Sequence, residues 1–251
     1  MAIETNSFCW HGIVSTDTET AQAFYKATIG WQTIEHGFPD GSTATMFAAA
    51  DFPRAHLRAP EGSEPCRWSS YLRVDDVDDS TAASTANGGT VLVPPTDIPP
   101  GRFSAIASPS GALLCLYHEL HEDQGANAPP GPGSIHWTEL QSDNVEADRE
   151  WLVATFGFEL SEMPMPAGGT YYILSSGGKP RGGLCPSFSD AIAGRWLNWV
   201  EVSDVDSALG TAKASGGQAV TEPSDYPGVG RMAIAQDPAG AAFGLITPAA
   251  S

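Results

Sequence analysis

Residues 67–78, RWSSYLRVDDVD, return at residues 195–206 as RWLNWVEVSDVD, and this pair of stretches decides the fold. Each stretch leads towards a Gly-Gly pair. Further along, GRFSAIASPSGALLCLY from residue 101 matches GRMAIAQDPAGAAFGLI from residue 230. A third block near the start of each copy repeats at almost the same distance. Because three blocks share nearly one spacing, the sequence indicates a tandem duplication.

The region between the two copies has a different composition. Residues 122–134, EDQGANAPPGPGS, are rich in proline and glycine and almost devoid of apolar side chains, which is typical of a linker. We therefore expect a first domain at residues 1–121, a linker at 122–133 and a second domain at 134–251.

Each copy divides again into two modules with one order of elements. At the start of the chain, the apolar run FCWHGIVS precedes TDTETAQAFYKATIG, in which Asp17 or Thr16 can cap a helix that Gly30 ends. Further strand-like runs follow it. The order strand–helix–strand–strand–strand occurs four times, which predicts an α+β protein of four βαβββ modules.

Composition limits the partners and the compartment. Thirty acidic and 12 basic side chains give a net charge of −18, which disfavours binding to nucleic acid or to an acidic membrane surface. Four cysteines without a CxxC motif do not indicate a disulfide scaffold. The sequence begins without a signal-peptide pattern and contains no apolar run of membrane-spanning length. We expect a cytoplasmic protein with no membrane or nucleic-acid partner.

The motifs FYKATIGW, V-DDVD followed by GG, and DPAGAAFGL resemble those of the vicinal oxygen chelate superfamily. This group includes glyoxalase I, extradiol dioxygenases and bleomycin-resistance proteins, and the chain is most similar to its two-domain, four-module glyoxalase-like members. The resemblance implies that paired modules form two curved, partly open, eight-stranded barrel-like sheets around clefts, with the helices outside. It does not imply one reaction, because the superfamily contains lyases, epimerases, dioxygenases and binding proteins.

Strand alternation predicts which side chains face the core and which face a cleft. The side chains expected in the core are Ile13, Leu72, Val74, Leu114, Leu116, Leu140, Phe243 and Leu245. The residues expected to face a cleft are Trp10, Gly12, Val14, Tyr71, Arg73, Cys115, Tyr117, Trp137, Glu139, Gln141, Trp199, Glu201, Gly244 and Ile246.

Metal-dependent members of the superfamily bind a divalent ion with a histidine near the start of a module's first strand and a glutamate on its last strand. The corresponding positions here hold Trp10, Ser69, Trp137, Leu197, Cys115 and Gly244. Only Cys115 among them is a metal-ligand type, and the other five positions offer it no second ligand. We expect that the metal is lost and that the protein has no cofactor.

Histidines offer little to replace those ligands. His11 lies one residue beyond the ligand position, so a one-residue register slip would turn it into the cleft, whereas the alternative is a hydrogen-bonded structural histidine. If any residue of the chain binds metal, it is His11. His118 and His121 have helical spacing beside the linker, where only adventitious binding is expected.

Aromatic and acidic side chains remain for the clefts. Tryptophans suit a mostly apolar or planar ligand, although they can also simply fill the interior. Glu139 and Glu201 both point inward, and paired desolvated carboxylates can transfer protons. Each could instead bond a tryptophan N–H or a backbone amide.

Two arginines recur at matching positions. Arg102 and Arg231 follow similar loops, and each either pairs with Asp97 or Asp225 to fix its loop or binds a ligand carboxylate.

The sequence supports three hypotheses. The first is a glyoxalase- or bleomycin-resistance-like protein that binds a small, largely apolar or aromatic molecule without the usual metal, as a monomer or homodimer. The alternative is an enzyme, a glyoxalase-type lyase or a dioxygenase, that uses a non-standard metal site or acid–base chemistry by Glu139 and Glu201. The third, a protein-interaction module, has little support in the sequence.

Overall fold

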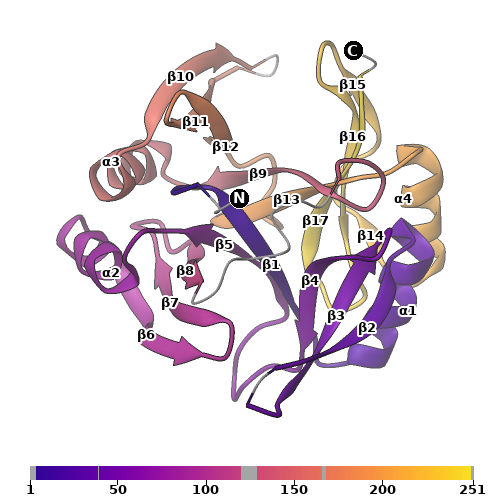
Figure 1. Ribbon diagram of the computed structural model, residues 1–251. Helices are drawn as coiled ribbons and strands as arrows, with labels where there is room; N and C mark the ends of the chain where they lie inside the picture. The colour runs from indigo at the N-terminus through magenta and orange to yellow at the C-terminus, as the bar shows by residue number, and fades with distance from the viewer. Residues whose placement is uncertain (1–3, 39, 120–128, 166–167, 250–251) are drawn as a thin grey trace. The chain divides into compact units, whose positions relative to one another are not determined.

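The computed structural model describes residues 4–38, 40–119, 129–165 and 168–249, and shows four modules with the expected order of elements (Figure 1). Module 1 contains β1 (Phe8–Val14), α1 (Thr18–Ile29), β2 (Gln32–Gly37), β3 (Thr43–Ala49) and β4 (Phe52–Arg58). Module 2 contains β5 (Arg67–Arg73), α2 (Val77–Ala86), β6 (Thr90–Ile98), β7 (Gly101–Ala107) and β8 (Leu113–Glu119).

The second copy repeats this order. Module 3 contains β9 (Ile135–Ser142), α3 (Val145–Phe156), β10 (Glu159–Pro164), β11 (Thr170–Ser176) and β12 (Lys179–Pro186). Module 4 contains β13 (Arg195–Glu201), α4 (Val205–Ala214), β14 (Gln218–Ala219), β15 (Ser224–Tyr226), β16 (Gly230–Gln236) and β17 (Ala242–Pro248). The fourth module departs from the pattern because two short strands, β14 and β15, replace one long strand beside β16.

The strands form two open mixed sheets, one of eight and one of nine strands. The order in the first is β2-β3-β4-β1-β5-β8-β7-β6. The order in the second is β10-β11-β12-β9-β13-β17-β16-β14, with β15 paired to β16. Within every module the first and last strands pair in parallel and the outer strands pair antiparallel. The predicted α+β class with four modules and two sheets is confirmed.

Each helix begins after an acidic or amide side chain. The caps Asp17, Asp76, Asn144 and Asp204 each accept a hydrogen bond from a backbone amide three residues on, which satisfies one of the free N–H groups of the first turn. Of the two candidates at the first helix, Asp17 is the cap. Gly30 ends α1 with φ of 78°, a left-handed conformation that glycine adopts without strain.

The modules belong to two compact units. Unit 1 comprises Met1–Trp10, Ser69–Ala126 and Trp137–Trp196, and so holds most of modules 2 and 3. Unit 2 comprises His11–Trp68, Asn127–His136 and Leu197–Ser251, and so holds most of modules 1 and 4. The division into sequence domains at 1–121 and 134–251 stays a prediction. Of the linker predicted at 122–133, residues 122–128 lie outside the described residues, as does His121.

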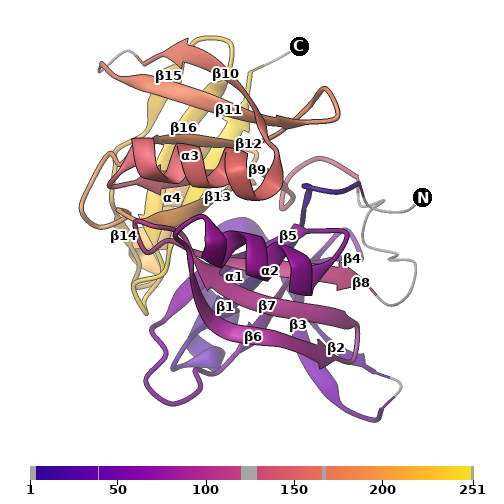
Figure 2. The same ribbon diagram turned by 90° about the vertical axis from the view of Figure 1, so that its left-hand side faces the viewer.

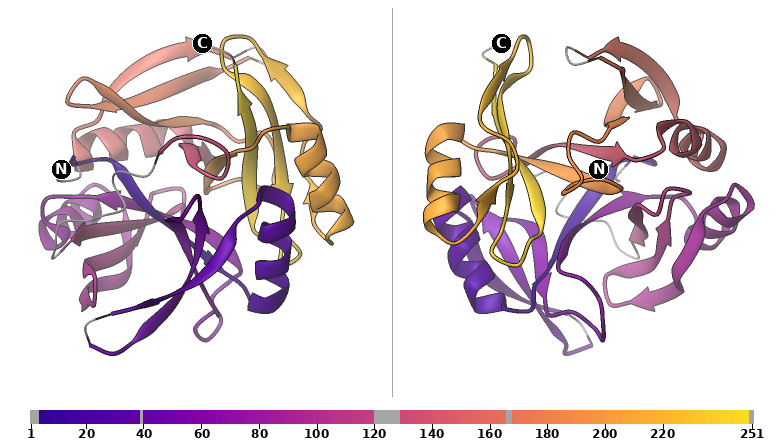
Figure 3. Two further views of the ribbon diagram at one scale, coloured as in Figure 1. Left: turned by 45° about the vertical axis from the view of Figure 1, so that its right-hand side comes forward. Right: turned by 180° about the vertical axis from the view of Figure 1, so that it is seen from behind.

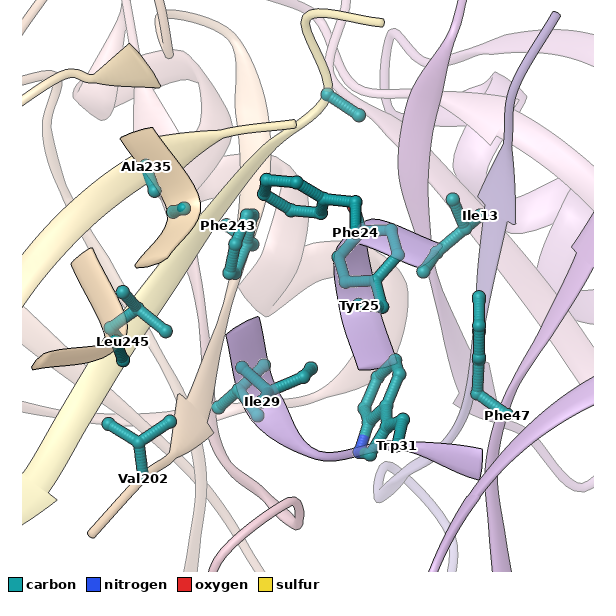
Figure 4. Close-up of a cluster of buried hydrophobic side chains, with 14 of the residues drawn as sticks. Ile13, Phe24, Tyr25, Ile29, Trp31, Phe47, Val202, Ala235, Phe243 and Leu245 are labelled. Carbon is teal, nitrogen blue, oxygen red and sulfur yellow. The ribbon is translucent and has the colours of Figure 1, made fainter. Parts of the chain in front are cut away.

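Unit 2 has a core between its two helices and their sheets. Helices α1 and α4 lie side by side (Figures 1 and 3). Figure 4 shows Tyr25 of α1 among Phe24, Phe47 and Phe243, with ring centroids 5.1–5.5 Å from its own. Edge-to-face ring packing of this kind adds stability beyond the burial of apolar area. The predicted core residues of this unit, Ile13, Phe243 and Leu245, are buried in this cluster.

A hydrogen-bonded triad crosses the same core and links α1 to the last turn of module 4. The Trp68 Nε1–H donates to the Tyr25 hydroxyl at 2.8 Å, and that hydroxyl donates to Asp237 Oδ2 at 2.9 Å. The other carboxylate oxygen of Asp237 accepts the amides of Ala239 and Ala241. Burial raises the pKa of Asp237 and, together with the charge of Asp237, raises that of Tyr25. We call these three side chains the core triad.

Unit 1 is built in the same way around α2 and α3. Its core contains the predicted residues Leu72, Val74, Leu114, Leu116 and Leu140, together with Trp151 and Leu152 of α3. The fully buried carboxylate of Asp148 on α3 accepts hydrogen bonds from Ser110 and Ser142, so it links two modules as Asp237 does in unit 2. The predicted alternation is therefore confirmed for the core side of the strands.

Among the described residues, no helix is long and apolar enough to cross a membrane.

Candidate functional site

The side of module 3 that faces away from α3 carries a concentration of polar and aromatic side chains. On β9, Leu140 points into the core, so Glu139 and Gln141 point to the opposite side. Glu139 is paired with Gly183, and Gln141 with Cys185, on the parallel strand β12. Helix α3 covers the other face (Figure 2). We call the residues on the side of the sheet opposite α3 the inner face of module 3; they are Trp137, Glu139, Gln141, Tyr171, Ile173, Gly183 and Cys185.

Hydrogen bonds join most of this face into one network. The Trp137 Nε1–H donates to the Tyr171 hydroxyl at 2.7 Å, and that hydroxyl donates to Glu139 Oε2 at 2.8 Å. Gln141 Nε2 donates to Glu139 Oε1 at 2.6 Å and to Cys185 Sγ at 3.2 Å. Glu139 is only 4% exposed. A buried carboxylate is thus held by two side-chain donors on a face that no helix of its module covers.

Gly183 makes the position of Tyr171 possible. A Cβ atom at residue 183 would lie 1.9 Å from the Tyr171 hydroxyl oxygen and 2.5 Å from Cζ, closer than any real contact. The absence of a side chain therefore lets the tyrosine lie across β12 and reach Glu139. Glycine inside a strand marks such close approaches.

Burial sets the protonation of two members. It raises the pKa of Tyr171 above its ordinary value, and the charge of Glu139 raises it further. Burial raises the pKa of Cys185 in the same way, again with Glu139 contributing. At neutral pH Tyr171 is therefore a hydrogen-bond donor, and Cys185 is a thiol rather than a nucleophilic thiolate.

Module 1 holds a different group at the equivalent place. Gly12 pairs with His56 in the register that joins Glu139 to Gly183, and a Cβ at residue 12 would lie 2.3 Å from the His56 ring. An imidazole thus lies over a glycine where module 3 has a carboxylate. Burial lowers the pKa of His56 to about 4 and that of His11 to about 3, so both rings are neutral at pH 7.

These buried histidines predict a loss of stability in acid. Above pH 6.5 both histidines are neutral in the folded and unfolded states, and they contribute no pH dependence. Below 6.5 the unfolded chain binds protons that the folded chain does not, so stability falls until about pH 4 for His56 and about pH 3 for His11. We expect urea unfolding between pH 6.5 and 4.5 to show a shallower decline for His56→Gln, by up to about 1.4 kcal/mol per pH unit. Parallel declines for the two proteins would contradict this.

The positions at which the superfamily binds its metal do not fit one here. The Trp137 indole nitrogen is a donor and gives its proton to Tyr171. Gly244 has no side chain, and the Trp199 ring covers it so closely that a Cβ would lie 2.2 Å away. Cys115 is buried beside Tyr71 on a paired strand. Within the described ranges, no group of three or more His, Cys, Asp or Glu residues could hold a metal ion.

The other predicted site residues are distributed over both units. Arg73 forms ion pairs with Asp75 and, at 3.4 Å, with Glu119. Trp10 is half-buried, like Tyr71, and Trp199 is 4% exposed.

The two predicted catalytic carboxylates have different surroundings. Glu201 lies in unit 2, with its carboxylate 3.7 Å from His136 Nδ1, whereas Glu139 lies in unit 1. A joint role for the two glutamates stays a prediction. One hypothesis for Glu139 was a hydrogen bond from a tryptophan N–H. The structure shows this in an indirect form, because Tyr171 lies between the Trp137 indole and the carboxylate.

The repeated arginines form repeated ion pairs. Arg102 contacts Asp97 at 2.7 Å and also Asp78, in the first turn of α2. Arg231 contacts Asp225 at 3.1 Å and also Asp206, in the first turn of α4. The loop-fixing contacts are therefore present, and each arginine in addition ties its strand to a helix. A ligand-binding role for either arginine stays a prediction.

Sequence reasoning missed Tyr171, Gly183 and Cys185. Alternation could have found Tyr171, because Leu174 is a core residue three positions along the same strand, which places position 171 on the opposite side. Nothing in the sequence indicated the pairing of strands that places the Tyr171 side chain against Gly183.

The chain belongs to the Glyoxalase/Bleomycin resistance protein/Dioxygenase superfamily, whose model matches residues 8–116 and 134–245. The resemblance inferred from the motifs is thus confirmed. Among its relatives, "Putative glyoxylase CFP32" of Mycobacterium bovis is 34% identical over 247 residues, covering 96% of this chain and 94% of that protein. The "Anthracycline biosynthesis protein DnrV" of Streptomyces peucetius is 28% identical over 254 residues, covering 94% and 91%.

Solved structures share the fold at low identity. The 2,3-dioxygenase LapB from Pseudomonas sp. KL28 superposes with a TM-score of 0.65 at 16% identity, covering 99% of this chain and 94% of that one. The Mn(II)-bound glyoxalase from Novosphingobium aromaticivorans gives 0.65 at 18%, covering 97% and 82%. At such identities the likeness concerns the fold, and the reaction has to be argued from the site.

Proposed function

We propose that the protein binds a small, largely apolar or aromatic molecule on the inner face of module 3, without the divalent metal of its superfamily. The observation that carries this proposal is the network from Trp137 through Tyr171 to the buried carboxylate of Glu139. A few convergent polar groups on an otherwise apolar surface are typical of ligand sites.

The core triad has the same arrangement of a tryptophan, a tyrosine and a carboxylate, but in a structural role. Trp68, Tyr25 and Asp237 are 6%, 0% and 3% exposed. In the inner-face network Trp137 and Tyr171 are only half-buried. The matching network is therefore less enclosed than the core triad, as a ligand site requires.

Exposed apolar side chains accompany this network. Met163 pairs with Tyr171 on the neighbouring strand β10 and is 45% exposed. Phe188, also 45% exposed, donates its backbone amide to Gln141. Large apolar side chains left exposed beside buried polar groups favour a binding surface. The relative DnrV is named for the biosynthesis of anthracyclines, which are polycyclic aromatic compounds, and this agrees with a planar apolar ligand.

Calorimetric titration with naphthalene derivatives tests the proposal. We expect 2-naphthol to bind protein that has been dialysed against EDTA, and Trp137→Ala to weaken binding about tenfold or more, because truncating a contacting indole removes packing area and the donor that orients Tyr171. Trp10→Ala changes the equivalent tryptophan of module 1 and serves as the control, with affinity unchanged. Equal weakening by both substitutions, or binding only after a divalent metal is added, would contradict the proposal.

An enzymatic role has one specific observation in its favour. Glu139 is a desolvated carboxylate with a tyrosine as its hydrogen-bond partner, an arrangement that can accept and return a proton. We propose as the second candidate a lyase acting on the adduct of an α-oxoaldehyde with a thiol, or a dioxygenase, with Glu139 as the acid–base residue. Turnover that survives EDTA and is lost in Glu139→Gln would favour this candidate over simple binding.

A further inference from the structure

We infer that the molecule bound on the inner face of module 3 donates a hydrogen bond to Tyr171 and carries no negative charge at that point, as a phenol or a protonated amine does. This inference rests on the proposed function and specifies the chemical class of its ligand. It follows because the side-chain hydrogen-bond donors of this face already donate to other groups of the protein.

The side-chain donors of the inner face come from three residues. Trp137 has one N–H and can only donate, and it donates to the Tyr171 oxygen at 2.7 Å. That contact requires Tyr171 to accept, so its own proton points elsewhere, to Glu139 Oε2 at 2.8 Å. Gln141 has two N–H protons on Nε2, which donates to Glu139 and to Cys185. The indole can only donate and the carboxylate accepts, so together they fix the direction of each hydrogen bond between them.

The remaining polar hydrogen of the set is not accessible to a ligand. The Cys185 thiol is a weak donor at best and is 0% exposed. Gln141 is also 0% exposed, and its carbonyl oxygen accepts the amide of Phe188 at 3.2 Å. A ligand that reaches this face therefore finds no side-chain donor of the network available for its carbonyl or carboxylate oxygens.

What the face does offer is an acceptor. A phenolic oxygen has two lone pairs, and the hydrogen bond from Trp137 occupies one of them. Tyr171 is half-buried, whereas Glu139 behind it is 4% exposed, so Tyr171 is the less enclosed member of this pair. The carboxylate polarises the Tyr171 oxygen and makes it a better acceptor, because chains of hydrogen bonds strengthen one another. The same charge repels an anion placed at Tyr171.

This polarity is the reverse of that in the metal-dependent members of the superfamily. A divalent cation takes lone pairs from the oxygens of its ligand, whereas the inner face of module 3 requires the ligand to supply the proton.

Four naphthalenes with the same ring and different substituents test the inference by calorimetry at pH 7 in EDTA. They are 2-naphthol, a donor; 2-methoxynaphthalene, which has no donor; 2-naphthoate, an anion; and 2-naphthylmethylammonium, a cationic donor. We expect 2-naphthol and the ammonium compound to bind about tenfold or more tightly than the methoxy compound, since one hydrogen bond in a charge-assisted network has this effect. We expect 2-naphthoate to bind at least about tenfold more weakly than 2-naphthol.

Two conservative variants and one control locate the preference. Tyr171→Phe should remove the preference for 2-naphthol over 2-methoxynaphthalene while the methoxy compound still binds. Glu139→Gln should reduce the discrimination against 2-naphthoate, because it removes the charge. Tyr25→Phe makes the same change in the core triad of unit 2 and should leave all four affinities in their original ratios.

The outcomes separate the inference from the proposed function. Equal affinities for 2-naphthol and 2-methoxynaphthalene, or tightest binding of 2-naphthoate, would overturn the inference and leave the binding function in place. No binding of any of the four up to about 1 mM would contradict the binding function itself. The comparison of ligands uses the unaltered protein, so it does not depend on whether a variant folds.

Discussion

Gly183→Ala is expected to weaken the binding of 2-naphthol by about 10- to 100-fold, the largest functional effect of any single methyl group on the inner face. The added Cβ would lie 1.9 Å from the Tyr171 hydroxyl, so the tyrosine must turn away and lose its contacts with both Trp137 and Glu139. Glu139 then remains in a buried position with one donor fewer, and the ligand loses its acceptor.

A second glycine supplies the matched control for that substitution. Gly210 lies inside α4, and nothing is within 4 Å of the position of its Cβ. Gly210→Ala should leave the affinity unchanged and increase stability by about 0.5–1 kcal/mol, because alanine loses less backbone entropy in a helix. An unchanged affinity in Gly183→Ala would show that the position of Tyr171 is irrelevant to binding.

Tyr25→Phe is expected to have the largest effect on stability, a loss of about 2–4 kcal/mol in the free energy of unfolding. The substitution removes one oxygen atom, yet it leaves both the Trp68 N–H and Asp237 Oδ2 without this partner in a closely packed core. Each buried polar group that loses its partner costs about 1–3 kcal/mol. Urea denaturation of the variant beside the original protein gives the difference directly.

The equivalent change in the inner-face network should cost less stability. Tyr171→Phe also removes a hydroxyl that bridges a tryptophan and a carboxylate, but Tyr171 and Trp137 are half-buried, so water can replace part of what is lost. We expect at most about half the loss seen for Tyr25→Phe. A larger loss in Tyr171→Phe than in Tyr25→Phe would mean that the inner-face network is primarily structural.

Local features of the fold were predictable because they depend on neighbours in sequence. Asp17 caps its helix because its carboxylate reaches a backbone amide three residues away. Leu140 is buried because strand alternation places it on the side of the sheet that faces the core. The repeat then extended each of these conclusions to the other modules. The irregular strands β14 and β15 of module 4 were not predicted, because the repeat gave no reason for that module to differ.

The site depended on contacts that sequence spacing does not encode. Glu139 was expected to face inward, and it does lie on the side away from the core. Its partner Tyr171 is 32 positions away on β11, and the contact exists because Gly183 lacks a side chain. The pairing of modules in compact units was equally out of reach. Leu140 and Leu72 share one core because α2 and α3 pack together, and nothing local to either residue indicates this.

The most direct test is a single titration of 2-naphthol into EDTA-dialysed protein whose metal content is measured in the same sample. The proposal that module 3 binds its ligand without a metal predicts saturable binding at about one site per chain, with divalent metal far below one ion per chain. The contrary result would be binding that appears only when a stoichiometric divalent ion is present and that Glu139→Gln and Tyr171→Phe leave unchanged.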